Sequence, residues 1–167
     1  LRVIPAFASG LDSRPAIEQF FVRDGRATVD TVVSLSGFSL VGGPAYNDAK
    51  AAEAMLAELD VPYLGVTPVE FQTLEQWENH DRGLLPVEAA MMVAIPELDG
   101  ATGSMVFGGR SEKTGAAQAR DMQAHNERAV MLAARVDKLV TLRRTQRAER
   151  KVAIVLFNFP PNAGHTG

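Results

Sequence analysis

The stretch from residue 32 to residue 77 constrains the fold most, because it alternates strand, helix and strand patterns within one short segment. Residues 31–35 and 61–66 are mainly β-branched and apolar runs, each followed by turn-forming residues, which predicts two buried strands. Asn47 or Asp48 can cap a helix between them, where apolar residues recur at helical spacing: Ala52, Met55, Leu56 and Leu59. The pattern predicts a right-handed βαβ unit, and ligands of such sheets bind beyond the carboxyl ends of the strands.

Two further apolar runs, residues 1–6 and residues 104–107, predict two more strands. Continuous apolar strands are typical of parallel sheets that are covered by helices on both faces. We therefore expect four parallel strands in the order 2-1-3-4. The sequence predicts an α/β fold with a parallel sheet flanked by helices, in a flavodoxin-like or Rossmann-like arrangement.

Three shorter helices are expected around this sheet. Ser13 and Pro15 suit the start of a helix that ends near residue 24, and residues 73–79 form a second short helix. Residues 86–94 form a third, which begins at a proline and is apolar nearly all round. We expect this third helix to be buried and to end at Pro96.

The pattern changes after residue 113. Residues 116–150 contain no proline or glycine, which predicts one long helix, and residues 152–157 form a purely apolar strand. The basic residues at the end of the helix fit a solvated terminus that the helix dipole favours, or a patch for an anionic ligand or a partner. We expect a domain over residues 1–113, a connecting helix over 114–151 and the start of a following domain over 152–167. The chain then reads as an interior piece of a longer protein.

Composition fits a globular chain of 167 residues, with 46% hydrophobic residues, 22% charged residues and a net charge of -3. The mild acidity argues against a nucleic-acid partner. The absence of cysteine excludes disulfides and thiolate metal sites within this sequence. No apolar run reaches the roughly 18 residues of a membrane span, and we expect a cytoplasmic protein.

Chemical motifs in the sequence are few. The loop SLVGGPAYND, residues 39–48, has glycines before a helix and fits either a tight turn or an anion site, but it matches neither G-x-G-x-x-G nor a P-loop. The three histidines, His80, His125 and His165, show no zinc-binding spacing. On the residues alone, the prediction is an α/β domain with a possible site at the carboxyl edge of its sheet.

Four long blocks carry a resemblance to a known family: VVSLSGFSLVGGPAYND, DVPYLGVTPVEFQTLEQW, AIPELDGATGSMVFGGR and VAIVLFNFPPNAGHTG. In this order they resemble the large porphyrin-binding subunits of magnesium chelatases of bacteriochlorophyll synthesis. A more distant resemblance is to the large subunit of aerobic cobaltochelatase. The resemblance covers nearly all of the chain from residue 32 onward.

The resemblance implies a subunit that holds protoporphyrin IX while AAA+ ATPase partners couple ATP hydrolysis to insertion of the substrate ion Mg²⁺. It implies no cofactor or metal bound to this segment, and it leaves the catalytic base unplaced. Polar residues inside the resembling blocks are the candidates for facing substrate or an interface: Glu70, Gln72, Glu97, Asp99, Arg110 and Asn158. The alternatives are the cobaltochelatase counterpart, acting on a corrin precursor, and a scaffold that docks the ATPase partners. We expect the isolated segment to fold without inserting Mg²⁺ or binding protoporphyrin tightly.

Overall fold

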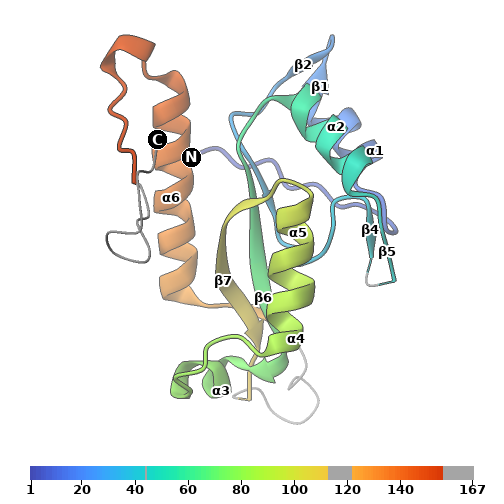
Figure 1. The fold of residues 1–167 in the computed structure, drawn as a ribbon, viewed down its shortest axis with the longest axis vertical. Coiled ribbons are helices and arrows are strands. Elements are labelled where there is room, and N and C mark those ends of the chain that lie inside the picture. Colours follow the sequence, from blue (N-terminus) through green and yellow to red (C-terminus); the bar gives the residue numbers. More distant parts are fainter. Residues whose placement is uncertain (44, 113–121, 156–167) are drawn as a thin grey trace, which may run out of the picture.

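The computed structural model describes residues 1–43, 45–112 and 122–155 and has an α/β fold built on a curved four-stranded sheet (Figure 1). The strand order is β3-β6-β7-β8. Strands β3 (Val32–Ser34), β6 (Tyr63–Thr73) and β7 (Thr102–Arg110) are parallel, and β8 (Met122–Ala124) pairs antiparallel with β7. The predicted α/β class is therefore confirmed, although the sheet is mixed and not purely parallel.

Helix α2 (Ala49–Leu59) forms the crossover between β3 and β6, as the sequence predicts. The Asp48 carboxylate caps it by accepting a 3.0 Å hydrogen bond from the backbone N–H of Ala51. Asp60 ends the helix in the left-handed conformation with φ of 47°. The helix buries three side chains against the sheet, Ala52, Met55 and Leu59, and these three belong to the predicted apolar face.

The second crossover joins β6 to β7 through three consecutive helical elements, α4 (Pro86–Ala89), the π-helical turn η1 (Ala90–Ala94) and α5 (Ile95–Leu98). The prediction that Pro96 ends the helix is wrong. In a regular α-helix the ring of Pro96 would clash with the carbonyl of Met92, which would also lose its donor. The wider π turn accommodates the proline, and the Met92 carbonyl accepts a 3.3 Å hydrogen bond from the Thr67 hydroxyl instead.

The expectation that this helix is buried on all sides is also wrong. Only one stripe of it is buried, namely Glu88, Met92 and Pro96, whereas Leu98 is 71% exposed. One side of the helix packs on β6, and the structure leaves the other side uncovered.

Small elements surround the sheet. Helix α1 (Arg14–Phe21) leads into the hairpin of β1 (Val22–Arg23) and β2 (Arg26–Ala27), and a second hairpin joins β4 (Gly42–Gly43) to β5 (Tyr46–Asn47). Helix α3 (Leu74–Asn79) follows β6 directly. The Thr73 hydroxyl and the Gln76 amide form a reciprocal capping box at its start.

The predicted strand at residues 1–6 is not a strand. These residues belong to no sheet and are mostly exposed, and they run from the side of α6 toward α1 (Figure 1). Pro5 has no N–H to donate to a neighbouring strand, which disfavours a central place in a ladder. The predicted order 2-1-3-4 is therefore wrong, because β3 lies directly beside β6.

The long helix is shorter than predicted. Helix α6 (Asn126–Arg144) begins after β8, at a cap formed by His125, and a 3₁₀ turn, η2 (Arg147–Glu149), follows it. Residues 113–121 lie outside the described residues. Gly108 and Gly109 allow β8 to approach β7 closely, since a Cβ on Gly108 would stand 2.2 Å from the carbonyl of Gln123. The prediction of helix across residues 122–124 is wrong for this reason.

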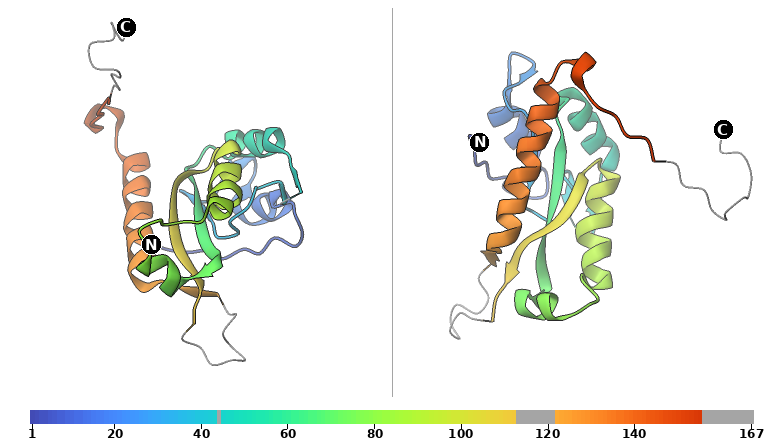
Figure 2. Two further views of the ribbon diagram at one scale, coloured as in Figure 1. Left: turned by 60° about the horizontal axis from the view of Figure 1, so that its bottom comes forward. Right: turned by 90° about the vertical axis from the view of Figure 1, so that its left-hand side faces the viewer.

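The end of the described chain carries no strand. Residues 151–155 form no regular element and lie on the side of α6 that faces away from the sheet (Figures 1 and 2). The rest of the strand predicted at residues 152–157, and Asn158 with it, lies outside the described residues. No helix in the described part of the chain is long and apolar enough to cross a membrane.

The buried apolar side chains form two separate clusters. The larger joins α1, α2, β3 and the amino-terminal part of β6, and it includes Ile17, Met55 and Leu59. The smaller lies between α3 and the far half of the sheet, around Val69, Leu74 and Val106. All residues of both clusters lie between residues 1 and 112, and α6 contributes to neither cluster.

Candidate functional site

An apolar cleft of about 740 Å³ opens beside the edge strand β3. One wall is the N-terminal strap, the extended segment of residues 1–11. The second wall is β3 with the loop that follows it, and the third is one face of α6. Its volume falls within the range of roughly 300–1,000 Å³ that is usual for ligand sites.

The loop after β3 reaches the cleft because its backbone packs tightly over β6. Gly37 has a φ of +69°, and a Cβ at this position would stand 2.7 Å from Cδ of Pro68. Only glycine fits both the left-handed conformation and the close approach. The loop then carries Phe38 and Leu40 to the cleft wall.

The lining offers hydroxyl groups but no charge. None of the described residues that line the cleft is a lysine, arginine, histidine, aspartate or glutamate. Ser34 and Ser36 share a hydrogen bond of 2.9 Å, and the Ser39 hydroxyl donates to Asp99 Oδ2 at 2.7 Å. These three serine hydroxyls are thus engaged with neighbouring groups of the chain itself.

Tyr63 adds a phenol hydroxyl to the lining. Burial raises the pKa of its hydroxyl, while the Ser34 hydroxyl lowers it and the charge of Asp99 raises it further. The two residues stand close enough for Ser34 to influence Tyr63, yet the buried Tyr63 oxygen has no partner in hydrogen-bonding geometry among the described residues. A buried hydroxyl without a partner is energetically unfavourable.

Asp99 holds the loop that forms the cleft wall. Its side chain is 1% exposed and follows α5 directly. Oδ2 accepts from the Ser39 hydroxyl and from the backbone N–H of Leu40 at 2.7 Å each, and Oδ1 accepts from Asn47 Nδ2 at 3.1 Å. This carboxylate therefore ties the end of the second crossover to the loop and to the β4–β5 hairpin.

Glu88 forms a second buried network, at the other end of the sheet. Residues 70–72 bulge out of the ladder between β6 and β7, because Val69 pairs with Gly109 and Thr73 pairs with Arg110. Glu88, which is 0% exposed, supplies the acceptors that these residues lose: Oε1 accepts from the N–H groups of Glu70 and Phe71 at 3.1 Å each. Oε2 accepts from Gln72 Nε2 at 2.7 Å and from the N–H of Leu85 at 3.0 Å.

A third cluster connects α6 to α3. The Trp77 and His125 rings meet edge to face with centroids 6.1 Å apart, and the Arg128 guanidinium lies 5.2 Å from the Trp77 centroid. His125 Nε2 lies 2.5 Å from Glu78 Oε1, and its Nδ1 accepts from the backbone N–H of Arg128 at 3.4 Å. Because Nδ1 is an acceptor, the neutral ring carries its proton on Nε2 and donates it to Glu78.

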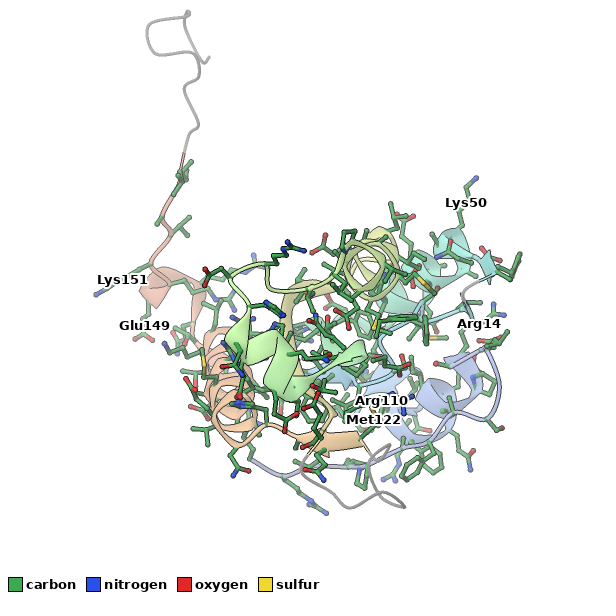
Figure 3. All side chains as sticks on the ribbon, turned by 90° about the horizontal axis from the view of Figure 1, so that it is seen from below. Arg14, Lys50, Arg110, Met122, Glu149 and Lys151 are labelled. Atoms are coloured by element: carbon green, nitrogen blue, oxygen red, sulfur yellow. The ribbon has the colours of Figure 1, made fainter. Side chains whose placement is uncertain are left out.

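The predicted site residues do not converge on one centre. Glu70, Gln72 and Arg110 lie near the carboxyl end of β6 and β7, where Arg110 pairs with Met122 of β8 (Figure 3). Gln72 is buried against Glu88, and Glu70 is partly buried. Asp99 lies at the opposite end, in its own buried network, and Glu97 is exposed on α5.

Sequence reasoning missed Glu88 and Tyr63. A signal for Glu88 was present, because proline at the first helical position followed by glutamate two residues later is the pattern of a helix cap, and Glu88 does cap α4 through the N–H of Leu85. No comparable signal marked Tyr63, because it stands among the apolar residues of the predicted strand 61–66 and nothing in the sequence distinguishes it from them.

The two buried carboxylates of the described residues serve the structure of the chain itself. Both buried carboxylates are surrounded by donors from the chain itself, three for Asp99 and four for Glu88. Within the described part of the chain, no three histidine, aspartate or glutamate side chains gather as a metal site. The fold and its networks thus define an α/β protein in which both buried carboxylates are held by the chain's own donors.

Comparison with known proteins places this domain in a family. A family model described as CobN/Magnesium Chelatase matches residues 1–167, so the chain belongs to the CobN/magnesium chelatase family. It is 50% identical over 180 residues to the magnesium-chelatase H subunit of Cereibacter sphaeroides and 50% identical over 177 residues to the protein of the same name in Rhodobacter capsulatus. These alignments cover 100% and 99% of this chain.

More distant relatives carry another name. The chain is 28% identical over 171 residues, 100% of its length, to the aerobic cobaltochelatase subunit CobN of Sinorhizobium sp, and covers 13% of that protein. It spans only 15% of each of the two magnesium-chelatase subunits. No solved structure gives a significant match to the chain.

Proposed function

We propose that this chain is a segment of the porphyrin-binding subunit of a magnesium chelatase, which inserts Mg²⁺ into protoporphyrin IX in bacteriochlorophyll synthesis. The observation that carries the proposal is the 50% identity, along the whole chain, to the magnesium-chelatase H subunits of two bacteria. The identity to the cobaltochelatase subunit of Sinorhizobium sp is 28% over the same length. The magnesium branch is therefore the better supported of the two.

The reaction makes demands that this segment does not meet by itself. Mg²⁺ gives up its hydration water reluctantly and prefers octahedral oxygen ligands, and two pyrrole nitrogens of the porphyrin must lose their protons. The buried carboxylates Glu88 and Asp99 are engaged by the chain's own donors, which argues against either of them as the base. We assign the base and the metal path to the rest of the subunit, and ATP hydrolysis to AAA+ partner subunits in the cytoplasm.

The six candidate residues keep distinct places in this proposal. Gln72 and Asp99 lie inside the buried networks and position the bulge of β6 and the loop after β3. Glu97 is exposed and Glu70 and Arg110 are partly so, which suits contact with substrate or with another domain. Asn158 belongs to the segment of residues 152–167 that we assign to a following domain, beyond the proposed domain of residues 1–113 and the connecting segment of residues 114–151.

The test uses the full-length subunit with purified ATPase partners. We expect protoporphyrin IX to bind the subunit and change fluorescence by quenching, and Mg²⁺ to be inserted only when ATP and both partners are present. A corrin precursor with Co²⁺ serves as the competing substrate pair, and turnover of that pair alone would overturn the assignment to the magnesium branch.

The isolated 167-residue chain is the matched comparison. We expect it to fold but to bind protoporphyrin much more weakly than the full-length protein, because the cleft is open and no described lining residue is cationic to face the porphyrin carboxylates. Equal affinity in the two proteins, measured by the same fluorescence quenching, would place the substrate site within these residues.

A further inference from the structure

The proposed function leaves the cleft beside β3 unexplained. Its walls expose large apolar side chains to solvent: Leu1 is 69% exposed, Phe7 91% and Leu35 52%. Contiguous apolar surface of this kind marks a place where something else binds. Three properties of the walls indicate what binds there: the uncharged lining, the edge strand β3 and the weak packing of α6.

The lining excludes occupants that must bury charge. With no charged side chain among the described lining residues, the cleft offers no counter-ion to a phosphate, a carboxylate or an ammonium group. The polar groups that it does offer are hydroxyls, and several serine hydroxyls already engage their neighbours, Ser36 with Ser34 and Ser39 with Asp99. An uncharged apolar occupant is the chemistry that fits.

The geometry of β3 adds a second requirement. This strand is the edge of the four-stranded sheet, and its only partner in the described chain is β6. All three residues of β3, Val32–Ser34, and Leu35 after them line the cleft. An open edge strand favours pairing with an added polypeptide strand, because backbone hydrogen bonds supply the affinity.

The third wall is poorly fixed by this chain alone. Helix α6, which is described along its whole length, buries no side chain. Ala129, Leu132 and Val136 face the cleft and stay only partly covered. Its polar contacts include the ion pair of Arg144 with Asp30 at 2.7 Å and the cluster at His125. A helix of 19 residues with no buried face lacks the packing that normally stabilises helices in proteins.

We propose that in the full-length subunit this cleft is filled by an uncharged apolar segment of the subunit's own polypeptide from outside these 167 residues. The relatives supply such polypeptide, because the chain spans 15% of their length. The occupant packs between the N-terminal strap and α6 and pairs with the open edge of β3. The cleft is then an internal domain interface and not a substrate pocket, an inference that rests on family membership and not on the proposed chelatase activity.

The experiment compares two neighbouring alanines of α6 in the full-length subunit. Both are exposed in this structure, but Ala133 lines the cleft and Ala134 lies outside the lining. The variants Ala133→Cys and Ala134→Cys are labelled with a thiol reagent, and the modified peptides are quantified by mass spectrometry, so that cysteines elsewhere in the protein do not interfere. Each rate is divided by the rate for the same peptide in denaturant.

We expect the thiol at position 133 to react at least about tenfold more slowly than the thiol at position 134, without porphyrin and independently of protein concentration. Equal rates would overturn the proposal, because the cleft would then be open to solvent. Protection that appears only with added protoporphyrin would overturn it in favour of a ligand pocket. Protection that disappears on dilution would overturn it in favour of a second copy of the full-length protein.

Discussion

The two longest described helices, α2 and α6, are attached to the same sheet in opposite ways. Helix α2 has 11 residues and buries three of them in the larger apolar cluster. Helix α6 has 19 residues and, along its fully described length, buries none. Figure 2 shows α6 running along the outside of the strands, with α2 and α5 beyond them. The difference teaches that helix length predicts little about how firmly a helix is held.

Polar contacts hold α6 at three levels. His125 contacts Glu78 at its start, Arg135 Nη1 donates to the carbonyl of Gly103 at 2.5 Å in its middle, and Arg144 pairs with Asp30 at its end. Such exposed ion pairs contribute about 0–1 kcal/mol each, whereas burying a single apolar side chain contributes about 1.5–3 kcal/mol. The α2 side should therefore be the more stable against local unfolding. Substitutions of its buried residues should lower the free energy of unfolding strongly, whereas substitutions in α6 should lower it little.

The largest effect is expected at Glu88, on the packed side of the sheet. Glu88→Ala should lower the free energy of unfolding by about 3–5 kcal/mol, since it leaves buried donors without an acceptor. Urea denaturation of the 167-residue chain measures this loss. Glu97→Ala is the matched control on the same helical segment, because Glu97 is exposed, and a comparable loss in the control would show that burial is not the cause.

A pair of methionines tests the comparison of helices directly. Met55 of α2 is 8% exposed and Met131 of α6 is 43% exposed. Met55→Ala should cost about 2–5 kcal/mol, as core truncations do. Met131→Ala should cost less than about 1 kcal/mol. Equal losses in urea denaturation would mean that α6 is packed as firmly as α2, and the distinction between the two helices would disappear.

Sequence periodicity predicted α2 correctly because its pattern is local. The cap at Asp48 and the apolar residues Ala52, Met55 and Leu59 act within a few turns, and burial follows from them. The same reasoning located the crossover from β3 to β6. The same reasoning failed for residues 1–6. Their apolar run fits a strand, but the run itself does not show whether another strand is available to pair with it.

The polar networks were beyond local reasoning for a different reason. The partners of Asp99 lie 52 to 60 residues away in the chain, and those of Glu88 up to 18 residues away. Asp99 was among the predicted site residues. Its contacts connect the end of α5 to the loop after β3, and they depend on the order of the strands in the sheet. The Met92 carbonyl, four residues before Pro96, likewise finds its partner far away in the chain, the Thr67 hydroxyl of β6.

The anchor at the start of α6 should give a smaller effect. His125→Ala removes the helix cap and the contact with Glu78 together and should cost about 0.5–2 kcal/mol. His125→Asn keeps a capping side chain while it removes the Glu78 contact, so it should recover part of the loss. Hydrogen exchange of the α6 amides separates the two contributions. No change in exchange in either variant would show that the anchor does not hold the helix.

The smallest effect at neutral pH is expected at Tyr63, in the wall shared by the packed core and the open cleft. Burial raises the pKa of its hydroxyl above the usual tyrosine value, and the charge of Asp99 adds to this. A raised folded-state pKa means that its contribution to stability is fully present below the unfolded pKa of about 10 and is lost as pH rises through the folded value. Tyr63→Phe removes this ionisation, so the variant should lose less stability than the parent above about pH 10.

At pH 7 the same substitution should change the free energy of unfolding by less than about 1 kcal/mol, because the buried hydroxyl has no hydrogen-bond partner to lose among the described residues. Tyr46→Phe is the matched control, since the Tyr46 side chain is 64% exposed. Urea denaturation from about pH 7 to about pH 11, a range that spans the tyrosine titration, measures both variants. A large loss for Tyr63→Phe at pH 7 would mean that the hydroxyl is satisfied in solution, and the edge of the cleft would then be better packed than the structure indicates.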